Sequence, residues 1–458
     1  MIDFNSDKRV FTMTGKGFSY VIFINGCGVV QNAYFGAGLS RTDGAFFADY
    51  LCKDYEPPVT NPNHKMLFNE MPGELGFYGR GDFREPTVIA RRSHGQRMSE
   101  FVYVCHRIFS GVPELPGLPC VRSGDETLEL LLRDELSEVE VKLLYTVSDT
   151  SDVLVRSLVI ANQGCEAVAL ERAFSFCTEF TDGNFRLLRL QGVQMGERQP
   201  EITDIGHGVT RIGSCRGASS HQLNPFVALL RPDCAEESGE CYGFGLVYSG
   251  SYALTAELSD VGLLRVQGGV NDLGFEWRLE PGEEFYAPQA ALVYSAGGLG
   301  TMSRAYADFY RERIISPAYA WKKRPVVVNN WEATYFQFDN EKLCRIIDEA
   351  AELGIDTFVL DDGWFGARDD DTSSLGDWVV NEKKLCGGLD AVISHCKKKG
   401  MRFGLWFEPE MICKKSRLYL AHPDYVLGAP GVEPVFSRNQ WILDFTRREV
   451  VDCIFHMI

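Results

Sequence analysis

Apolar and polar residues alternate along the first two thirds of the chain, which is the pattern of half-buried β-strands. From Phe11 to about Ser295, short apolar runs with a period of two are broken by Gly, Asn and Asp. Within Glu138–Tyr145, for example, an apolar side chain occupies every second position. Tyr20–Ile24 leads into Asn25-Gly26, a dipeptide typical of two-residue type I′ hairpin turns. This run of strands predicts a large β-sandwich over residues 1–300.

Beyond residue 300 the period of the pattern changes. Apolar residues now recur at helical spacing, at Met302, Ala305, Tyr306, Phe309 and Tyr310. The sequence therefore predicts a connecting helix and linker over residues 301–324, followed by a second domain over residues 325–458.

The second domain begins with one strand and one helix. The apolar run Val326–Val328 predicts the strand, Asp339 can cap the following helix, and Gly354 can end it. The expected inner face of this helix consists of Leu343, Ile346, Ile347, Ala350 and Leu353.

The alternation of strand and helix then repeats. A second strand is predicted at Phe358–Leu360 and a third at Met401–Phe407. The helix between them ends at Gly400, and its expected apolar residues are Leu389, Val392, Ile393 and Cys396. This rhythm predicts parallel strands with right-handed crossovers, hence a barrel or a doubly wound sheet.

The predicted barrel is incomplete. A last helix is expected from a capping box at Thr446–Glu449, and the sequence stops within it at Ile458. Residues 325–458 are about half of the roughly 250 residues that an eight-stranded barrel needs. We therefore expect a multidomain β plus α/β protein with about the first three βα units of a (β/α)8 TIM barrel.

The three strand ends share an unusual composition. Asn329–Glu332, Asp361–Trp364 and Trp406–Glu410 each combine an indole with carboxylates or amides. The C-terminal ends of the strands carry the working residues of α/β barrels. Carboxylates can accept hydrogen bonds from sugar hydroxyls, and an aromatic ring can cover the apolar face of a pyranose. The alternative is that each Asp caps a helix or turn and each Trp belongs to the core. Recurrence at three ends favours a sugar site.

Glu408 and Glu410 are a second, weaker candidate pair. Alternate residues share one face of a strand, and glycosidases use paired carboxylates. Two residues on one strand approach a bond from the same side, however, whereas acid and nucleophile flank the scissile bond. We therefore expect neither residue to be catalytic.

Taken together, four segments resemble the bacterial α-galactosidases of glycoside hydrolase family 36. The segments are Asn329–Phe336, Leu360–Gly366, Ser374–Trp378 and Gly404–Met411, and their order and spacing make the match specific. Shorter matches extend the resemblance at His422–Asp424, Ser437–Gln440, Leu443-Asp444 and, more weakly, Gly79–Arg84.

The resemblance implies an N-terminal β-supersandwich, a catalytic TIM barrel and a C-terminal β-domain. It implies retaining hydrolysis of terminal α-linked galactose from melibiose or raffinose-type oligosaccharides. By the same resemblance, Asp361 and Asp362 bind galactose hydroxyls, Trp331 and Trp406 shape the pocket, and Arg438 matches a further pocket residue.

The sequence also departs from the family pattern. The family's nucleophile is an Asp in a Lys-Trp-Asp segment on strand four, and its acid/base is an Asp near strand six. Neither segment occurs here, so both residues are expected beyond Ile458 and the chain as written is predicted to be inactive. The Cys- and Gly-containing loop near the second hydroxyl of the sugar is missing as well. An α-N-acetylgalactosaminidase, an α-galactosyl transferase and a non-catalytic sugar-binding module therefore remain open.

The composition argues against several classes of binding partner. The net charge is −17 and no run of Lys and Arg is longer than the three residues Lys397–Lys399, which argues against nucleic acid. The 14 Cys have no CxxC spacing and the eight His are dispersed, so no metal or other cofactor is expected. With no signal peptide or long apolar stretch, we expect a cytoplasmic protein without membrane contact. The resemblance implies a homo-oligomer, a tetramer, although the acidic positions from Asp43 to Asp54 depart from the expected pattern.

Overall fold

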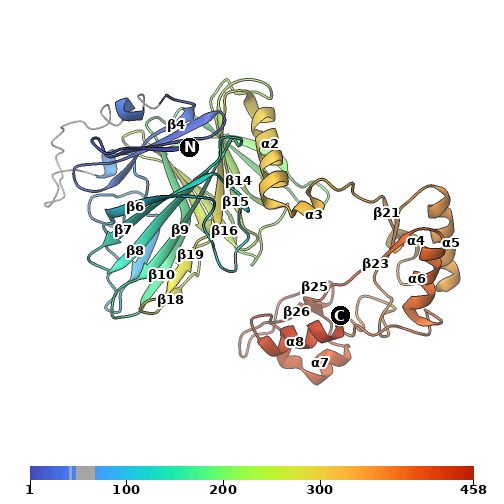
Figure 1. The fold of residues 1–458 in the computed structure, drawn as a ribbon. Coiled ribbons are helices and arrows are strands. Elements are labelled where there is room, and N and C mark those ends of the chain that lie inside the picture. The colour runs from blue at the N-terminus through green and yellow to red at the C-terminus, as the bar shows by residue number, and fades with distance from the viewer. Residues whose placement is uncertain (41–43, 48–67) are drawn as a thin grey trace. The chain divides into compact units, whose positions relative to one another are not determined.

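The computed structural model describes residues 1–40, 44–47 and 68–458. The chain forms two compact units, Met1–Trp321 and Lys322–Ile458 (Figure 1). The acidic positions Asp43 and 48–54, which bear on the expected tetramer, lie outside the described residues. Each unit is described by itself below.

The first unit is built from antiparallel sheets. In the described part of the chain, ten strands form the largest sheet, in the order β12-β11-β14-β15-β20-β9-β8-β7-β6, with β19 also pairing with β9. Its strands are β6 (Val102–Ser110), β7 (Glu126–Asp134), β8 (Val139–Val147), β9 (Val153–Asn162), β11 (Arg186–Gln191), β12 (Gln199–Asp204), β14 (Leu223–Leu230), β15 (Cys241–Val247), β19 (Glu284–Tyr286) and β20 (Gln289–Ser295).

Two smaller sheets complete this unit over the same described residues. Six strands follow the order β13-β16-β17-β10-β18, with β5 pairing beside β10, and four more follow the order β1-β2-β3-β4. The six are β5 (Val88–Arg91), β10 (Val168–Phe180), β13 (Gly208–Ser214), β16 (Tyr252–Leu258), β17 (Leu264–Val270) and β18 (Trp277–Leu279). The four are β1 (Ile2–Asn5), β2 (Val10–Thr14), β3 (Phe18–Ile24) and β4 (Val30–Ala37).

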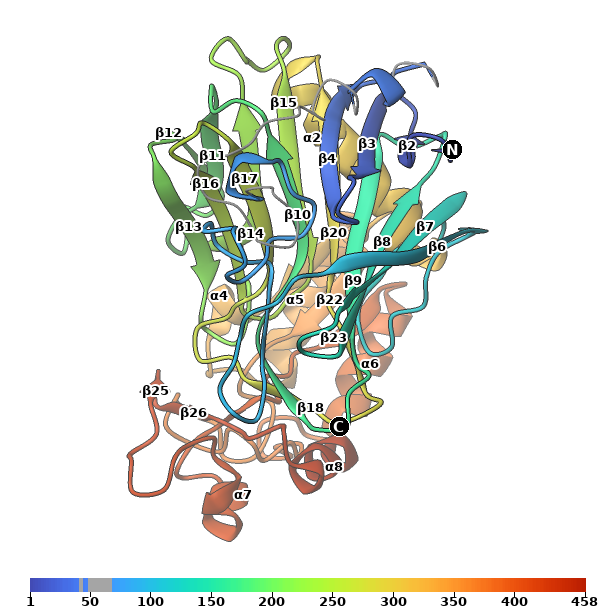
Figure 2. The same cartoon turned by 90° about the vertical axis from the view of Figure 1, so that its left-hand side faces the viewer.

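The core of the first unit lies between these sheets. One hydrophobic cluster contains Leu143 and Ile160 of the largest sheet, Phe176 and Leu254 of the six-stranded sheet, and Ile22 of the four-stranded sheet. Figures 1 and 2 show the sheets lying against one another as layers. Alternation produces this packing, because successive side chains on a strand point to opposite faces. The predicted β-sandwich is confirmed.

The helix after the sandwich packs against it. Helix α2 (Gly298–Phe309) lies along β15 and β20 (Figure 1). Met302, Tyr306 and Phe309 are buried there, and the Tyr306 hydroxyl donates to the backbone oxygen of Ala291 over 2.8 Å. Two short elements follow, η2 (Tyr310–Ile314) and α3 (Pro317–Ala320).

The first hairpin of the four-stranded sheet differs from the prediction. Five residues join β3 to β4, from Asn25 to Val29, where Asn25-Gly26 predicted a two-residue turn. The Asn25 side-chain oxygen accepts from the backbone N–H groups of Cys27 and Val29, over 2.9 and 3.0 Å. Gly28, at φ 82°, takes the left-handed position. The Asn25 side chain thus stabilises a longer loop by bonding to its backbone, which the association of Asn-Gly with two-residue turns does not predict.

The second unit contains three parallel strands. β21 (Val327–Asn329), β22 (Thr357–Leu360) and β23 (Arg402–Leu405) pair in that order. α4 (Trp331–Thr334) and α5 (Asn340–Glu352) follow β21, and α6 (Gly388–Lys398) follows β22. Leu343 of α5, Leu360 of β22 and Val392 of α6 share one hydrophobic cluster. This arrangement confirms the predicted α/β fold with three βα units.

Helix α5 follows its predicted capping closely. The Asp339 side chain accepts from the backbone N–H of Lys342 over 2.9 Å, and Gly354 adopts φ 77° just past the helix. Leu343 and Ile347 are fully buried, as expected. The prediction is wrong for Leu353, which is 80% exposed, because it follows the last helical residue and the chain turns outward there.

A small subdomain is formed by the last elements of the second unit. It contains β24 (Met411–Ile412), α7 (Arg417–Ala421), η3 (Pro423–Tyr425), β25 (Phe436–Ser437), β26 (Gln440–Ile442) and α8 (Arg448–Met457). The predicted capping box of α8 is wrong, because the N-cap residue is Arg447 and makes no side-chain cap. The Thr446 hydroxyl donates to Asp444 instead. None of the helices among the described residues is long and apolar enough to cross a membrane.

Candidate functional site

The ends of β21 and β22 are tied together by two asparagines. Asn330 is fully buried, and its side-chain oxygen accepts from the backbone N–H of Asp361 over 2.8 Å. The Asn329 amide donates to the Asp361 carboxylate, while the Asn329 oxygen accepts from the backbone N–H of Trp331. These bonds fix Asp361 relative to the start of α4.

Asp361 keeps acceptor capacity. It is half-buried, and its other oxygen accepts from the backbone N–H of Asp362 over 2.7 Å. Within the described ranges no Lys, Arg or His forms a salt bridge with it. An ionised carboxylate offers about four lone-pair positions, and only neutral N–H groups occupy those of Asp361 here. It can therefore accept further bonds from a polar ligand.

Asp362 has a different environment. It is 3% exposed and forms a two-pronged ion pair with the fully buried Arg368. The Arg368 Nη2 and Nε atoms lie 2.8 and 3.0 Å from the two carboxylate oxygens, and Nη1 donates to the backbone oxygen of Ser373. Sequence reasoning missed Arg368, because a lone Arg in a polar loop carries no periodic signal. The pair fixes the Asp362 carboxylate in place.

Glu408, just beyond β23, is affected by charges from several segments. Burial raises the pKa of the half-buried Glu408 carboxyl, Glu410 and Asp362 raise it further, and Arg438 and Arg368 oppose the rise. The Gln440 amide donates to this carboxylate over 3.3 Å. Charges following β22 and β23 and the Arg438 turn are therefore close enough to influence one another.

Arg438 stands in the turn of the β25–β26 hairpin. Arg438 and Asn439 have φ values of 52° and 59°, the left-handed pair that a tight hairpin turn requires. Asn tolerates this conformation, whereas Arg adopts it less readily. The turn exposes the Arg438 side chain to solvent, where its guanidinium can donate hydrogen bonds.

The indoles of the strand-end motifs divide into core and surface residues. Trp364 is 2% exposed, and its Nε1 donates to the backbone oxygen of Trp406 over 3.0 Å. Trp378 packs against Trp364 and Trp406, with ring centroids 6.1 Å apart in each case. Trp364 therefore fits the structural reading of these motifs, whereas Trp406 is partly exposed at the edge of the cluster.

Trp331 is also partly exposed. It begins α4, and the rings of Tyr335 and Phe336 stand edge-on to it at 5.1 Å. Trp331 and Trp406 thus remain available to a ligand, each held by aromatic neighbours.

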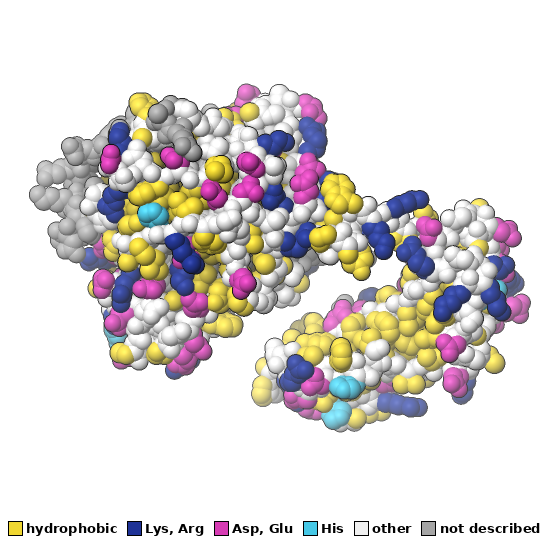
Figure 3. All heavy atoms as spheres, viewed as in Figure 1, with side chains coloured by type: hydrophobic (Ala, Val, Ile, Leu, Met, Phe, Trp, Pro, Cys, Tyr) yellow, Lys and Arg dark blue, Asp and Glu magenta, His cyan; other side chains and the backbone are white. Residues whose placement is uncertain are grey.

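Apolar side chains gather on the surface of the subdomain that carries Arg438. Figure 3 shows hydrophobic side chains around β25 and β26. Val435 is 91% exposed, Val432 63% and Phe436 55%. This surface is suited to a partly apolar ligand or to further protein. Over residues 1–40, 44–47 and 68–458, no group of three or more His, Cys, Asp or Glu is arranged to hold a metal ion.

Two family models match the chain. The glycosyl hydrolase family 36 N-terminal domain matches residues 28–280, and the melibiase domain matches residues 284–458. The chain belongs to glycosyl hydrolase family 36. The resemblance carried by the strand-end motifs is thereby confirmed.

Relatives in this family match the chain over its whole length. It is 40% identical over 463 residues to alpha-galactosidase Mel36A of Lactobacillus acidophilus, covering 100% of this chain and 63% of that protein. It is 39% identical over 461 residues to alpha-galactosidase AgaA of Geobacillus stearothermophilus, again covering 63% of the relative. The chain thus spans less than two thirds of the length of these relatives.

Solved structures agree with the fold. The family 36 α-galactosidase AgaB of Geobacillus stearothermophilus superposes with a TM-score of 0.94 at 39% identity, covering 100% of this chain and 63% of that one. A variant of AgaA in complex with raffinose gives 0.92 at 40% identity, covering 98% and 63%. The predicted β-supersandwich followed by part of a TIM barrel is confirmed by these likenesses.

Proposed function

We propose that this chain contributes galactose-binding residues to an α-galactosidase, a retaining hydrolase of terminal α-linked galactose in melibiose or raffinose-type oligosaccharides. One observation carries the proposal: the Asp361 carboxylate accepts from the Asn329 amide at the end of β21, and no Lys, Arg or His among the described residues forms a salt bridge with it. Asp361 follows directly after a barrel strand. The names of the relatives and the raffinose bound to the AgaA variant support it.

The roles of the site residues follow from their surroundings. Asp361 accepts hydrogen bonds from sugar hydroxyls, because its free lone pairs point to no cation. Asp362 contributes a second carboxylate, whose position Arg368 fixes. Trp331 and Trp406 cover apolar C–H faces of the sugar. Arg438 donates to a hydroxyl or ring oxygen from its exposed turn.

The 458 residues by themselves bind galactose without cleaving it. Retaining hydrolysis needs a nucleophile and an acid/base about 5 Å apart across the scissile bond. The family's Lys-Trp-Asp nucleophile segment does not occur in this sequence. Glu408 and Glu410 follow one strand and approach a sugar from one side.

Calorimetric titration of the 458-residue chain with galactose and melibiose tests the binding role. Asp361→Ala should weaken binding about 10- to 100-fold, because a hydrogen bond to a charged group contributes about 1.5–3 kcal/mol. Asp371→Ala, which removes a carboxylate in the following acidic loop, is the matched control and should leave the affinity unchanged. Equal affinities of the wild type and Asp361→Ala would refute the assignment.

Hydrolysis is tested on the protein expressed from its natural gene. Galactose released from melibiose and raffinose supports the α-galactosidase. Release from an N-acetylated analogue alone would assign an α-N-acetylgalactosaminidase, and transfer of galactose to a second sugar would assign a transferase. Binding with no turnover of any of these substrates would favour the non-catalytic sugar-binding module.

The proposal also covers location and assembly: the protein is cytoplasmic and forms a homotetramer. The thirteen cysteines among the described residues are all free thiols, which suits a reducing compartment. The tetramer rests on the family resemblance. Light scattering of the natural gene product would measure its mass, and a monomer would contradict the tetramer.

A further inference from the structure

Two adjoining pockets lie on the first unit. One has a volume of about 300 Å³ and the other about 280 Å³, and both are lined by Glu284 and Tyr286 of β19. Because they share these two residues, the two pockets together are here called the β19 groove. Its two halves differ in chemistry.

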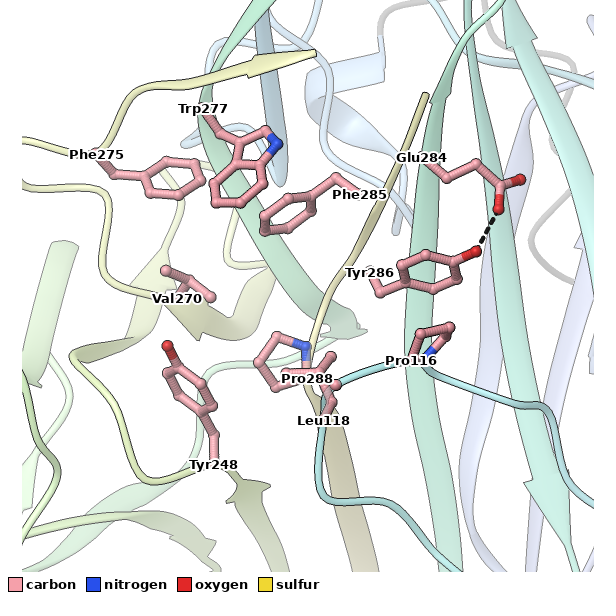
Figure 4. A pocket seen from close by; sticks show the side chains of 11 residues that line it. Pro116, Leu118, Tyr248, Val270, Phe275, Trp277, Glu284, Phe285, Tyr286 and Pro288 are labelled. Atoms are coloured by element: carbon pink, nitrogen blue, oxygen red, sulfur yellow. Dashed lines mark hydrogen bonds between the residues drawn. The ribbon is translucent and has the colours of Figure 1, made fainter. Parts of the chain in front are cut away.

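The first half of the β19 groove is aromatic. It is formed where β18 of the six-stranded sheet comes near β19 of the largest sheet. Figure 4 shows Phe275, Trp277 and Phe285 side by side, with Tyr248 across the pocket from them. The Phe285 ring centroid lies 5.5 Å from Trp277 and 5.9 Å from Phe275, and Trp277 is 51% exposed.

The second half is polar. Lys142 Nζ lies 2.6 Å from one Glu284 oxygen, and the Tyr286 hydroxyl donates to the other (Figure 4). Hydrogen bonds from Lys142 and then from Tyr286 lower the pKa of Glu284, so this carboxylate stays ionised at neutral pH. Across the groove, Arg107 donates to both oxygens of Glu129 over 2.9 and 2.7 Å.

The balance of charges selects the ligand class. In the lining, Arg107 and Lys142 already form ion pairs with Glu129 and Glu284, and Glu114 adds a third carboxylate. A strongly charged ligand would have to break these pairs. A neutral ligand with many hydroxyls can bond to their remaining donors and acceptors, and its C–H faces can rest on the aromatic half. Neutral oligosaccharides combine both features.

We propose that the β19 groove is a second binding site, for a neutral oligosaccharide. One sugar ring stacks against Trp277 and Phe285, and hydroxyls of a neighbouring ring bond to Glu284 and Lys142. Its lining comes from residues of the first unit, and the proposal goes beyond the function proposed above. It would hold a longer saccharide by a part of the chain that performs no chemistry.

The test removes the strand-end site first. Binding of raffinose and stachyose to the 458-residue chain carrying Asp361→Ala is measured by saturation-transfer NMR and calorimetry. Binding should persist in this background and should fall at least tenfold when Trp277→Ala is added. Trp321→Ala, which removes a 70% exposed indole outside the groove, is the matched control and should change nothing. No binding in the Asp361→Ala background, or equal binding with and without Trp277→Ala, would overturn the proposal.

An unfolding measurement and one further variant distinguish lost binding from a folding defect. Thermal unfolding of Trp277→Ala should match that of the parent, because the indole is half exposed. If Trp277→Ala unfolds at a lower temperature than the parent, Glu284→Gln is used instead to test the groove. This variant keeps the side-chain shape but loses the charge that pairs with Lys142. It should weaken raffinose binding several-fold, and unchanged affinity would count against the groove. Weaker binding of galactose by Asp361→Ala tests the function proposed above, whereas loss of the raffinose binding that remains in this background on adding Trp277→Ala tests the β19 groove.

Discussion

The carboxylates described in the two units differ in how completely they are paired with cations. In the sandwich, Asp82 and Glu179 are each in contact with both Arg84 and Arg265, and all four side chains are at most 5% exposed. In the second unit, by contrast, the Asp361 carboxylate accepts from the Asn329 amide and the backbone N–H of Asp362, and no cation among the described residues forms a salt bridge with it.

A second buried cluster in the sandwich follows the same rule. Glu74 is fully buried and accepts from the hydroxyls of Tyr20 and Tyr145 over 2.9 Å, while Arg156 forms an ion pair with it. Asn32 donates a further bond. Although burial raises the pKa of Glu74 and Arg156 opposes the rise, every acceptor of this carboxylate has a partner.

This difference in pairing distinguishes charged side chains that stabilise the fold from those that can bind a ligand. A buried charge whose hydrogen bonds are all made stabilises one packing arrangement, because removing any member exposes the others to an apolar surrounding. A half-buried carboxylate with unused lone pairs contributes little to folding and can serve a ligand. Asp361 belongs to the second kind, and Asp362 with Arg368 lies between the two.

The largest expected loss of stability comes from removing one cation of the buried ion-pair network in the sandwich. Arg265→Ala leaves Asp82 and Glu179 each with a single cation, and breaking a buried ion pair costs about 3–5 kcal/mol. Urea unfolding of the first unit, followed by hydrogen exchange, should show a loss near the upper end of this range. Arg278→Ala removes an exposed pair with Glu280 and should cost less than about 1 kcal/mol. Similar losses for the two variants would contradict the comparison.

Arg368→Ala should produce the next largest effect. It leaves one buried carboxylate, Asp362, without its cation, so we expect a loss of about 3 kcal/mol, confined to the second unit. Hydrogen exchange of α5 and α6 should accelerate while that of the sandwich stays unchanged. Arg368→Ala should weaken galactose binding as well, because it releases Asp362. Unchanged protection of α5 and α6 would show that the pair is dispensable.

Asp339→Ala should have a moderate effect on the second unit. The variant removes the side-chain acceptor at the start of α5, and loss of an N-cap costs about 1 kcal/mol. Asp339→Asn retains an acceptor and should recover most of the stability in the same unfolding measurement. If the two variants lost equal stability, the cap would not be the cause.

The smallest effect is expected at Glu408 and depends on pH. Its folded-state pKa is raised, chiefly by burial, so the folded state binds more protons than the unfolded state and stability falls as pH rises through this range. Glu408→Gln removes the charge and keeps the acceptor for Gln440. It should therefore stabilise the second unit slightly at pH 7, and the gain should fade below the ordinary pKa of Glu. A gain that grew on acidification would reverse this sign and refute the account.

Local signals predicted the elements well where one residue controls one bond. Asp339 stands at the start of α5 and Gly354 just past its end, as their chemistry requires, and the alternation from Val139 to Tyr145 lies within β8. Prediction failed where a competing contact decided the outcome. Asn25 organises a five-residue loop, and the Thr446 hydroxyl bonds to Asp444 rather than capping α8.

The site itself was predicted only in part. Asp361, Asp362, Trp331 and Trp406 were found because they follow strands, and Arg438 because it matches a family motif. Whether they bind sugar stays a prediction. Arg368 and the β19 groove escaped sequence reasoning, since Lys142 of β8 and Glu284 of β19 lie far apart in the sequence and meet only across β9, with which both strands pair.

The sequence by itself determined the periodicities, and with them a β-sandwich followed by parallel βα units, because side-chain burial repeats with the geometry of each element. It also determined the family, through motifs at strand ends. Only the tertiary structure decided which charges are neutralised. Arg265 and Glu179 are fully paired while Asp361 is not, because pairing depends on contacts between segments that periodicity cannot describe.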